Sequence, residues 1–198
     1  HNMNNEYAYG EARDPGGDDL ALPEEAPFQV GEEIEVGDLS KVQKSVLPAA
    51  RDVRFEVLAT TIEKTKSGYI KYLKAKLRVV NGIPSTNDEG ELVMTHAGKV
   101  CFPGVMDLCI WHDKNAPDPK GWWKAQDQGS REYQLGIKQF SQACGFDISD
   151  PTFKINDTYH TMAAGKHILG SISHETNKQD GRVSEKFGNW KVAPEEEG

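Results

Sequence analysis

Apolar and polar residues alternate most regularly between residues 69 and 80, YIKYLKAKLRVV. Successive side chains of a β-strand point to opposite faces, so the odd-numbered residues from Tyr69 to Val79 form a mainly apolar row. The even-numbered positions hold a tyrosine and three cations: Tyr72, Lys74, Lys76 and Arg78. We therefore predict a strand with one face in the core and a basic face turned outward.

Other segments predict hairpins on either side of this strand. Residues 54–65 alternate in the same way, and Phe55, Val57, Ala59 and Thr61 share one face. The polar turn KTKSG then joins them to the basic strand. Residues 166–176 and 181–192 form a last hairpin.

Between these hairpins the pattern is less regular. Residues 81–91 predict a loop, and the apolar stretch 92–111, broken by glycine and proline, predicts two short strands or one bulged strand. A long polar loop over 112–129 follows. Residues 130–147 are the one segment with helical spacing; Ser130 suits its start and Gly145 its end.

These elements predict a mainly β fold. Five or so strands with one inserted helix and flexible acidic ends favour a small OB-like β-barrel, and a β-sandwich is the alternative. We expect an acidic flexible N-terminal arm over 1–40, an OB-like nucleic-acid-binding domain over 41–193 and a short acidic C-terminal tail over 194–198.

The charge distribution supports this division. The whole chain carries a net charge of −8, which alone argues against an anionic partner. However, residues 1–40 hold eleven acids and one base, and the tail holds three more acids. Residues 41–193 are left with 22 bases and 17 acids. A basic body with acidic ends is typical of nucleic-acid contact.

The basic row and nearby aromatics form the candidate binding site. Lysines two residues apart lie roughly 6.6 Å apart along a strand, which suits the phosphates of a single strand. We expect Lys64 and Lys66 at the hairpin tip to continue the row. Indole rings in or beside a polar loop could stack on bases, and the candidates are Trp111, Trp122 and Trp123. A merely solvated strand face is the alternative.

Nothing in the sequence predicts catalysis or a cofactor. The nucleophile-elbow, phosphate-loop and zinc-protease motifs are absent, and His160, His167 and His174 do not group as metal ligands. The odd number of cysteines, three without a CxxC pair, predicts buried, reduced thiols. We therefore expect neither an enzyme nor a metal site.

Several segments resemble phage-type single-stranded DNA-binding proteins. They are LPAARDVRFEVLATTIEKTKSGYIKYLKAKLRVVNG, GIKQFSQACGFD and GNWKV, in that order, and the resemblance covers about 45–193. It implies an OB fold that coats single-stranded DNA in viral replication or recombination. The long acidic arm is N-terminal, however, and the end APEEEG lacks the terminal hydrophobic residues that recruit partners in bacterial single-strand binders.

We therefore expect a sequence-tolerant single-stranded DNA-binding protein in the cytoplasm of an infected host cell. Its partners would be single-stranded DNA and replication or recombination proteins; no membrane is expected, and a homodimer is one open possibility. The alternatives are RNA binding by the same surface and a non-catalytic β-barrel or sandwich interaction module, such as a viral structural component.

Overall fold

The computed structural model describes residues 31, 33–42, 45–118 and 131–196, and the chain divides into two units, His1–Ser45 and Val46–Gly198. In the described part of the first unit, one 3₁₀ turn, η1 (Leu39–Lys41), is capped by Asp38, whose carboxylate accepts a hydrogen bond from the Ser40 amide at 3.0 Å. Hydrogen bonds from Ser40 lower the pKa of Asp38. The division after Ser45 falls a few residues beyond the predicted end of the acidic arm.

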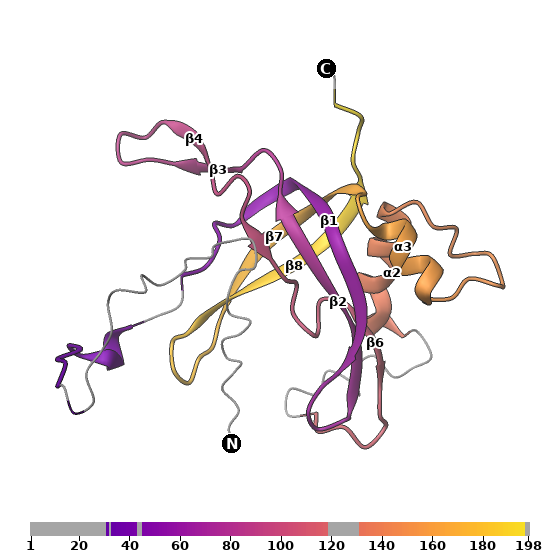
Figure 1. Cartoon of the computed structure of the whole chain (residues 1–198), viewed down its shortest axis with the longest axis horizontal. Coiled ribbons are helices and arrows are strands. Elements are labelled where there is room, and N and C mark those ends of the chain that lie inside the picture. Colours follow the sequence, from indigo (N-terminus) through magenta and orange to yellow (C-terminus); the bar gives the residue numbers. More distant parts are fainter. Residues whose placement is uncertain (1–30, 32, 43–44, 119–130, 197–198) are drawn as a thin grey trace. The chain divides into compact units, whose positions relative to one another are not determined.

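The second unit is built on one antiparallel sheet (Figure 1). Its strands are β1 (Ala50–Lys64), β2 (Ile70–Val79), β5 (Val100–Cys101), β6 (Cys109–His112), β7 (His167–Thr176) and β8 (Val183–Val192). They pair in the order β5-β2-β1-β7-β8, and β6 also pairs with β2. Both predicted hairpins and the mainly β class are confirmed. Among the described strands this order is an open path, so closure into a barrel stays a prediction.

A small second sheet consists of β3 (Ile83–Thr86) and β4 (Leu92–Thr95). Its turn is held by Asn87, whose side chain accepts a hydrogen bond from the Glu91 amide at 2.8 Å. We had predicted a loop over 81–91, and for β3 that prediction is wrong. The strand is short and contains Pro84, so its local pattern is that of a loop.

In the described residues between β6 and β7 there are two α-helices. The predicted helix over 130–147 is shorter in the structure: a 3₁₀ turn, η2 (Glu132–Gln134), leads into α2 (Leu135–Ala143), and Gly145 follows at φ 95°. A second helix, α3 (Asp157–Ala163), corrects the prediction of a single inserted helix. Asn156 caps it by accepting a hydrogen bond from the Tyr159 amide at 3.0 Å, which is the sequence signal that the pattern analysis missed.

The core lies between the sheet and α2, around Trp190 on β8. The indole packs against Phe140 of α2 at 5.2 Å between ring centroids, and against Phe55 and Phe187 at 6.1 and 6.4 Å. Gly170 on β7 provides the space that the indole occupies, because a Cβ at this position would lie 2.5 Å from the Trp190 ring. The sheet and the helix are thus joined by one aromatic cluster.

A β-bulge interrupts β1 between Val57 and Ala59. Beyond it Thr60 turns inward, buried, and its hydroxyl lies 2.7 Å from His160 Nδ1 on α3, while Ala59 is exposed. The prediction that Ala59 shares the face of Phe55 is therefore wrong. One extra residue in a strand reverses the facing of all that follow.

The C-terminal residues that we predicted as a flexible tail make defined contacts as far as Glu196. Its carboxylate accepts a hydrogen bond from Asn81 Nδ2 at 2.9 Å and lies 3.6 Å from Arg54 Nε. The bond from Asn81 and the charge of Arg54 lower the pKa of Glu196.

The described residues include no helix that is long and apolar enough to cross a membrane.

Candidate nucleic-acid interface

From Leu73 to Val79 the two faces of β2 are as predicted. Four of its odd-numbered side chains are completely buried: Leu73, Ala75, Leu77 and Val79. The side chains between them, from Tyr72 to Arg78, are exposed or half-buried. We call the outward row of Tyr72, Lys74, Lys76 and Arg78 the basic row; its cations stand on a strand that the core holds rigidly.

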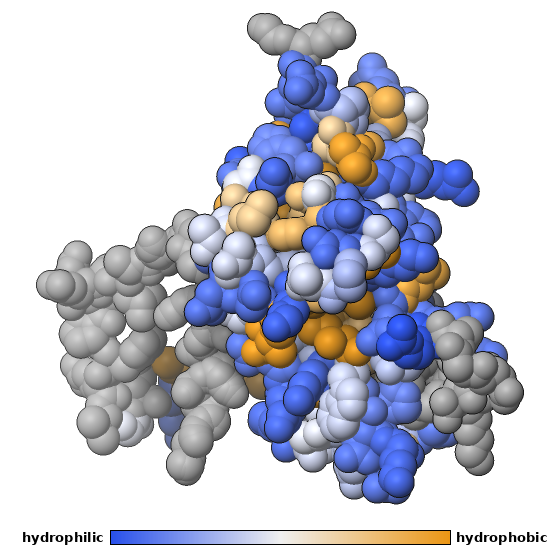
Figure 2. All heavy atoms as spheres, turned by 90° about the vertical axis from the view of Figure 1, so that its right-hand side faces the viewer, coloured by the Kyte–Doolittle hydropathy of each residue, from blue (hydrophilic) through white to orange (hydrophobic). Residues whose placement is uncertain are grey.

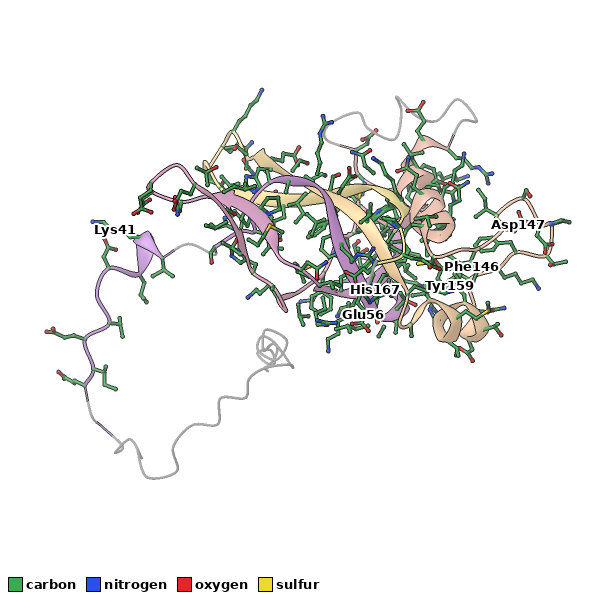
Figure 3. The ribbon with its side chains drawn as sticks, turned by 90° about the horizontal axis from the view of Figure 1, so that it is seen from above. Lys41, Glu56, Phe146, Asp147, Tyr159 and His167 are labelled. Atoms are coloured by element: carbon green, nitrogen blue, oxygen red, sulfur yellow. The ribbon has the colours of Figure 1, made fainter. Side chains whose placement is uncertain are left out.

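The cation at one end of the basic row already has a partner. Arg78 stands opposite Glu56 of β1, and its Nε donates to Glu56 Oε1 at 3.1 Å while a second guanidinium nitrogen donates to the same oxygen. His167 of β7 stands opposite Glu56 on the other side (Figure 3). The charge of Arg78 is therefore balanced before any ligand binds. The alternation of residues along β2 did not indicate this pairing.

Two lysines in the middle of the row make no ion pair with any other described residue. Lys76 stands opposite the small side chain of Ala59. Lys74 Nζ lies 5.6 Å from the ring centroid of Phe102, which is 42% exposed. The short strand β5 pairs with β2 and so brings Phe102 beside the row. Lys74 and Phe102 together present a positive charge and an aromatic face.

Tyr72 ends the row on the hairpin side, opposite Glu63 of β1. Burial raises the pKa of its phenol, and the negative charge of Glu63 raises it further. The hydroxyl therefore stays protonated at neutral pH and can donate a hydrogen bond. Glu63, however, brings a negative charge to this end of the row.

The hairpin tip does not continue the row as predicted. Lys64 stands opposite Lys71, and Lys71 stands opposite Trp111 of β6. Residues directly opposite each other share a face, so these three lie on the face of the odd-numbered residues, and the prediction that Lys64 continues the basic row is wrong. Lys71 Nζ lies 5.1 Å from the indole centroid of Trp111, which is 39% exposed. We call Lys64, Lys71 and Trp111 the hairpin row.

Lys66 lies exposed in the turn that joins β1 to β2. The turn is closed by the Thr65 amide, which donates to the Ile70 carbonyl at 2.9 Å, and Gly68 adopts φ 79° within it. Both rows are therefore built on the same hairpin, one on each face, with Lys66 between them at its end.

Sequence reasoning did not include Lys71 and Phe102 in the site. Lys71 belongs to the odd-numbered row that we assigned to the core, but the core ends at Leu73. Ile62, which pairs with Leu73, is already 42% exposed. Phe102 is placed by a two-residue strand pairing that no local pattern indicates.

Trp122 and Trp123 lie outside the described residues, so their part in the site stays a prediction. The three histidines at seven-residue spacing form hydrogen bonds with three different partners. His160 bonds Thr60, His167 bonds Arg54, and His174 bonds the Leu47 carbonyl. In the described part of the chain, no three His, Cys, Asp or Glu residues are grouped to hold a metal ion.

All three cysteines are buried, as predicted. Burial raises the pKa of Cys101 and of Cys144 to about 12, and that of Cys109 to about 11.

No family model and no curated protein matches the chain. The resemblance to phage single-strand binders therefore rests on the sequence segments quoted above, and the argument for function rests on the two rows.

Proposed function

We propose that the second unit binds single-stranded DNA without base specificity, along both rows of the β1–β2 hairpin. One observation carries this proposal: two exposed aromatic rings each have a lysine ammonium over them, Lys71 on Trp111 and Lys74 on Phe102. A base can stack on such a ring for about 1–3 kcal/mol, and the neighbouring ammonium can contact the adjacent phosphate. Neither interaction reads the base.

The available charge supports a phosphate ligand. Five lysines on or beside the hairpin make no ion pair with another described residue, and they are Lys64, Lys66, Lys71, Lys74 and Lys76. Lysine is common on exposed surfaces, but these five stand on one hairpin, and β5 and β6 bring two aromatic rings beside it. A merely solvated strand face would not require the rings.

The strand order supports an OB-type architecture. β2 pairs with β1, β5 and β6 both pair with β2, and β7 returns to pair with β1 on its other side, which is the Greek-key order. A partly open, five-stranded Greek-key barrel is the OB fold, and it binds oligonucleotides on strands 2 and 3 and on the loop between strands 1 and 2. Those positions correspond here to β2, β5 and β6 and to the turn with Lys66.

The proposal includes a biological setting. A role in viral DNA replication or recombination, with proteins of those processes as partners, follows from the sequence resemblance. The same surface could bind RNA, because phosphate contacts and base stacking do not depend on the 2′-hydroxyl group that distinguishes RNA from DNA. Parallel measurements with oligo-dT and oligo-U decide between DNA and RNA.

A salt titration of binding to labelled oligo-dT, followed by fluorescence anisotropy, tests the proposal. The double variant Lys71→Ala/Lys74→Ala should reduce the slope of log K against log[salt] by about 1.4, because each lost phosphate contact on a single strand contributes about 0.7. The matched control Lys166→Ala/Lys178→Ala removes two exposed lysines outside the hairpin and should leave the slope unchanged.

Stacking is tested separately with Trp111. Trp111→Ala should weaken oligo-dT binding by about 1–3 kcal/mol, and Trp111→Phe should retain part of that affinity. Val183→Ala is the control, since Val183 has the same 39% exposure as Trp111 but lies on β8. If the wild-type chain does not bind oligo-dT even at low salt, the proposal fails and an interaction module becomes the better hypothesis.

A further inference from the structure

The β3–β4 hairpin exposes apolar side chains that the rest of its unit does not cover. Leu92 is 73% exposed and Met94 is 56% exposed. They share one face with Pro84, because Pro84 pairs with Met94 and Thr86 pairs with Leu92. A two-stranded hairpin is marginally stable by itself, and adjacent exposed apolar residues mark an interaction surface.

The tip of this hairpin is acidic. Asp88, Glu89 and Glu91 lie in or beside the turn, and no lysine or arginine occurs between residues 83 and 95. Such a tip repels phosphates, so the hairpin is unsuited to nucleic acid. The surface that complements it has an apolar floor and a positively charged rim.

The second unit carries a surface of that kind beside α2. A groove with a volume of about 610 Å³ lies between α2 and the segment that leads to α3. Its apolar lining comprises Ile110, Leu135, Ile137, Ile148, Phe153 and Ile155. Its charged lining comprises three cations and one acid, namely Arg131, Lys138, Lys154 and Glu132, and two neutral polar residues complete it. Figure 2 shows apolar surface enclosed by hydrophilic residues on this side of the protein.

The wall of the groove is preformed. Phe153 lines the groove and packs edge-on against Tyr159 at 6.1 Å between ring centroids, and Tyr159 in turn stacks on Phe146 at 4.3 Å (Figure 3). On the helix side, Leu135 is 51% exposed although it lines the groove. A rigid wall and an exposed leucine favour a ligand that supplies apolar side chains.

We propose that copies of this chain associate head to tail, with the β3–β4 hairpin of one copy in the α2 groove of the next. Leu92 and Met94 would contact the apolar floor, and the acidic tip would lie against Lys138 and Lys154. The hairpin and the groove lie on different sides of the second unit (Figure 1). The contact is therefore heterologous and leaves one hairpin and one groove open for further copies.

This association does not depend on nucleic-acid binding. If the chain also binds a single strand, repeated head-to-tail contacts would make that binding cooperative. The association is best measured by sedimentation velocity in the absence of nucleic acid. The weight-average sedimentation coefficient of the full chain should rise with protein concentration, and the rise should be smaller at high salt because the rim charges are screened.

Two apolar variants test the two surfaces. Leu92→Ser/Met94→Ser and Leu135→Ser should each weaken self-association by about tenfold or more, as expected for the central apolar residues of an interface. Mixed together they should form a one-to-one complex, because one variant keeps the groove and the other keeps the hairpin. Val192→Ser is the control; Val192 is comparably exposed but lies on β8 and should have no effect.

Charge reversal provides an independent test. Asp88→Lys/Glu89→Lys and Lys138→Glu/Lys154→Glu should each prevent self-association. Their mixture should restore association into chains of alternating copies, because each variant's hairpin is then opposite in charge to the other variant's groove. A wild-type chain that stays monomeric at all concentrations overturns the proposal. Loss of association in the hairpin variants without loss in the groove variants would also overturn it, because it would indicate a hairpin-to-hairpin contact.

Discussion

At the scale of single residues, ion pairing separates the cations of the basic row into available and occupied ones. Arg78 is held by Glu56, whereas Lys74 and Lys76 make no ion pair with another described residue. A phosphate can bind Arg78 only if it replaces a carboxylate that already accepts two hydrogen bonds. Such charge-assisted bonds are the stronger ones. The contribution of each cation therefore depends on its neighbour across the strand pair.

We predict that Lys76→Ala reduces the salt slope of oligo-dT binding by about 0.7, and that Arg78→Ala reduces it by less. Glu56→Gln should instead increase the slope, because it removes the charge that occupies Arg78. The measurement is the anisotropy titration described above, with urea unfolding to verify that each variant is folded. Equal losses for Lys76→Ala and Arg78→Ala would show that Arg78 leaves Glu56 to bind phosphate.

At the scale of elements, close packing between β7 and β8 positions the sheet under α2. Gly170 is the residue at which Trp190 crosses β7, and an added Cβ would meet the indole at 2.5 and 2.6 Å and Phe55 at 3.3 Å. Gly188 lies on the adjacent strand, and a Cβ there would meet nothing within 4 Å. The two glycines are therefore a matched pair: a methyl group would clash with the core at Gly170 and would fit in open space at Gly188.

Gly170→Ala should reduce the free energy of unfolding by about 1–3 kcal/mol, because the core must shift to admit the methyl group. Gly188→Ala should change it by about 0.5 kcal/mol or less, as for other unconstrained positions. Urea denaturation followed by tryptophan fluorescence measures both. If the two variants are equally stable, the indole does not lie against β7 as described.

At the scale of the whole second unit, the three thiols report on cooperative unfolding. They come from β5, β6 and the end of α2, so no single local opening exposes them together. Their pKa values, about 12 for Cys101 and Cys144 and about 11 for Cys109, leave little thiolate near pH 8. Since the thiolate is the reactive form, the native thiols are protected twice, by burial and by protonation.

We predict that a thiol reagent such as DTNB labels the native chain slowly at pH 8, and that all three thiols react together as urea unfolds it. The raised pKa values also make stability depend on pH. An unfolded cysteine ionises near pH 8.5, so the free energy of unfolding should fall as the pH rises from there towards 11. Rapid labelling of one cysteine without urea would reveal a local opening at its element.

The sequence by itself determined the two long hairpins, the alternation of β2 and the burial of the cysteines. These depend on side-chain period and on turn residues such as Gly68, which act over a few neighbouring positions. It also indicated the position of α2, because an apolar stripe at helical spacing and Gly145 lie within one short segment. The same local rules missed α3 and β3, whose signals, one capping residue and four residues around a proline, are brief.

Only the tertiary structure decided which side chains meet at the candidate site. The bulge in β1 determines which face Thr60 lies on. The pairing of β5 with β2 places Phe102 beside Lys74. The register between β1 and β2 places Arg78 opposite Glu56, with which it forms an ion pair. Strand pairing joins residues far apart in the sequence, and its register is selected by the burial of a whole face at once. The composition of each row is therefore a property of the assembled sheet, although the lysines themselves could be found from the sequence.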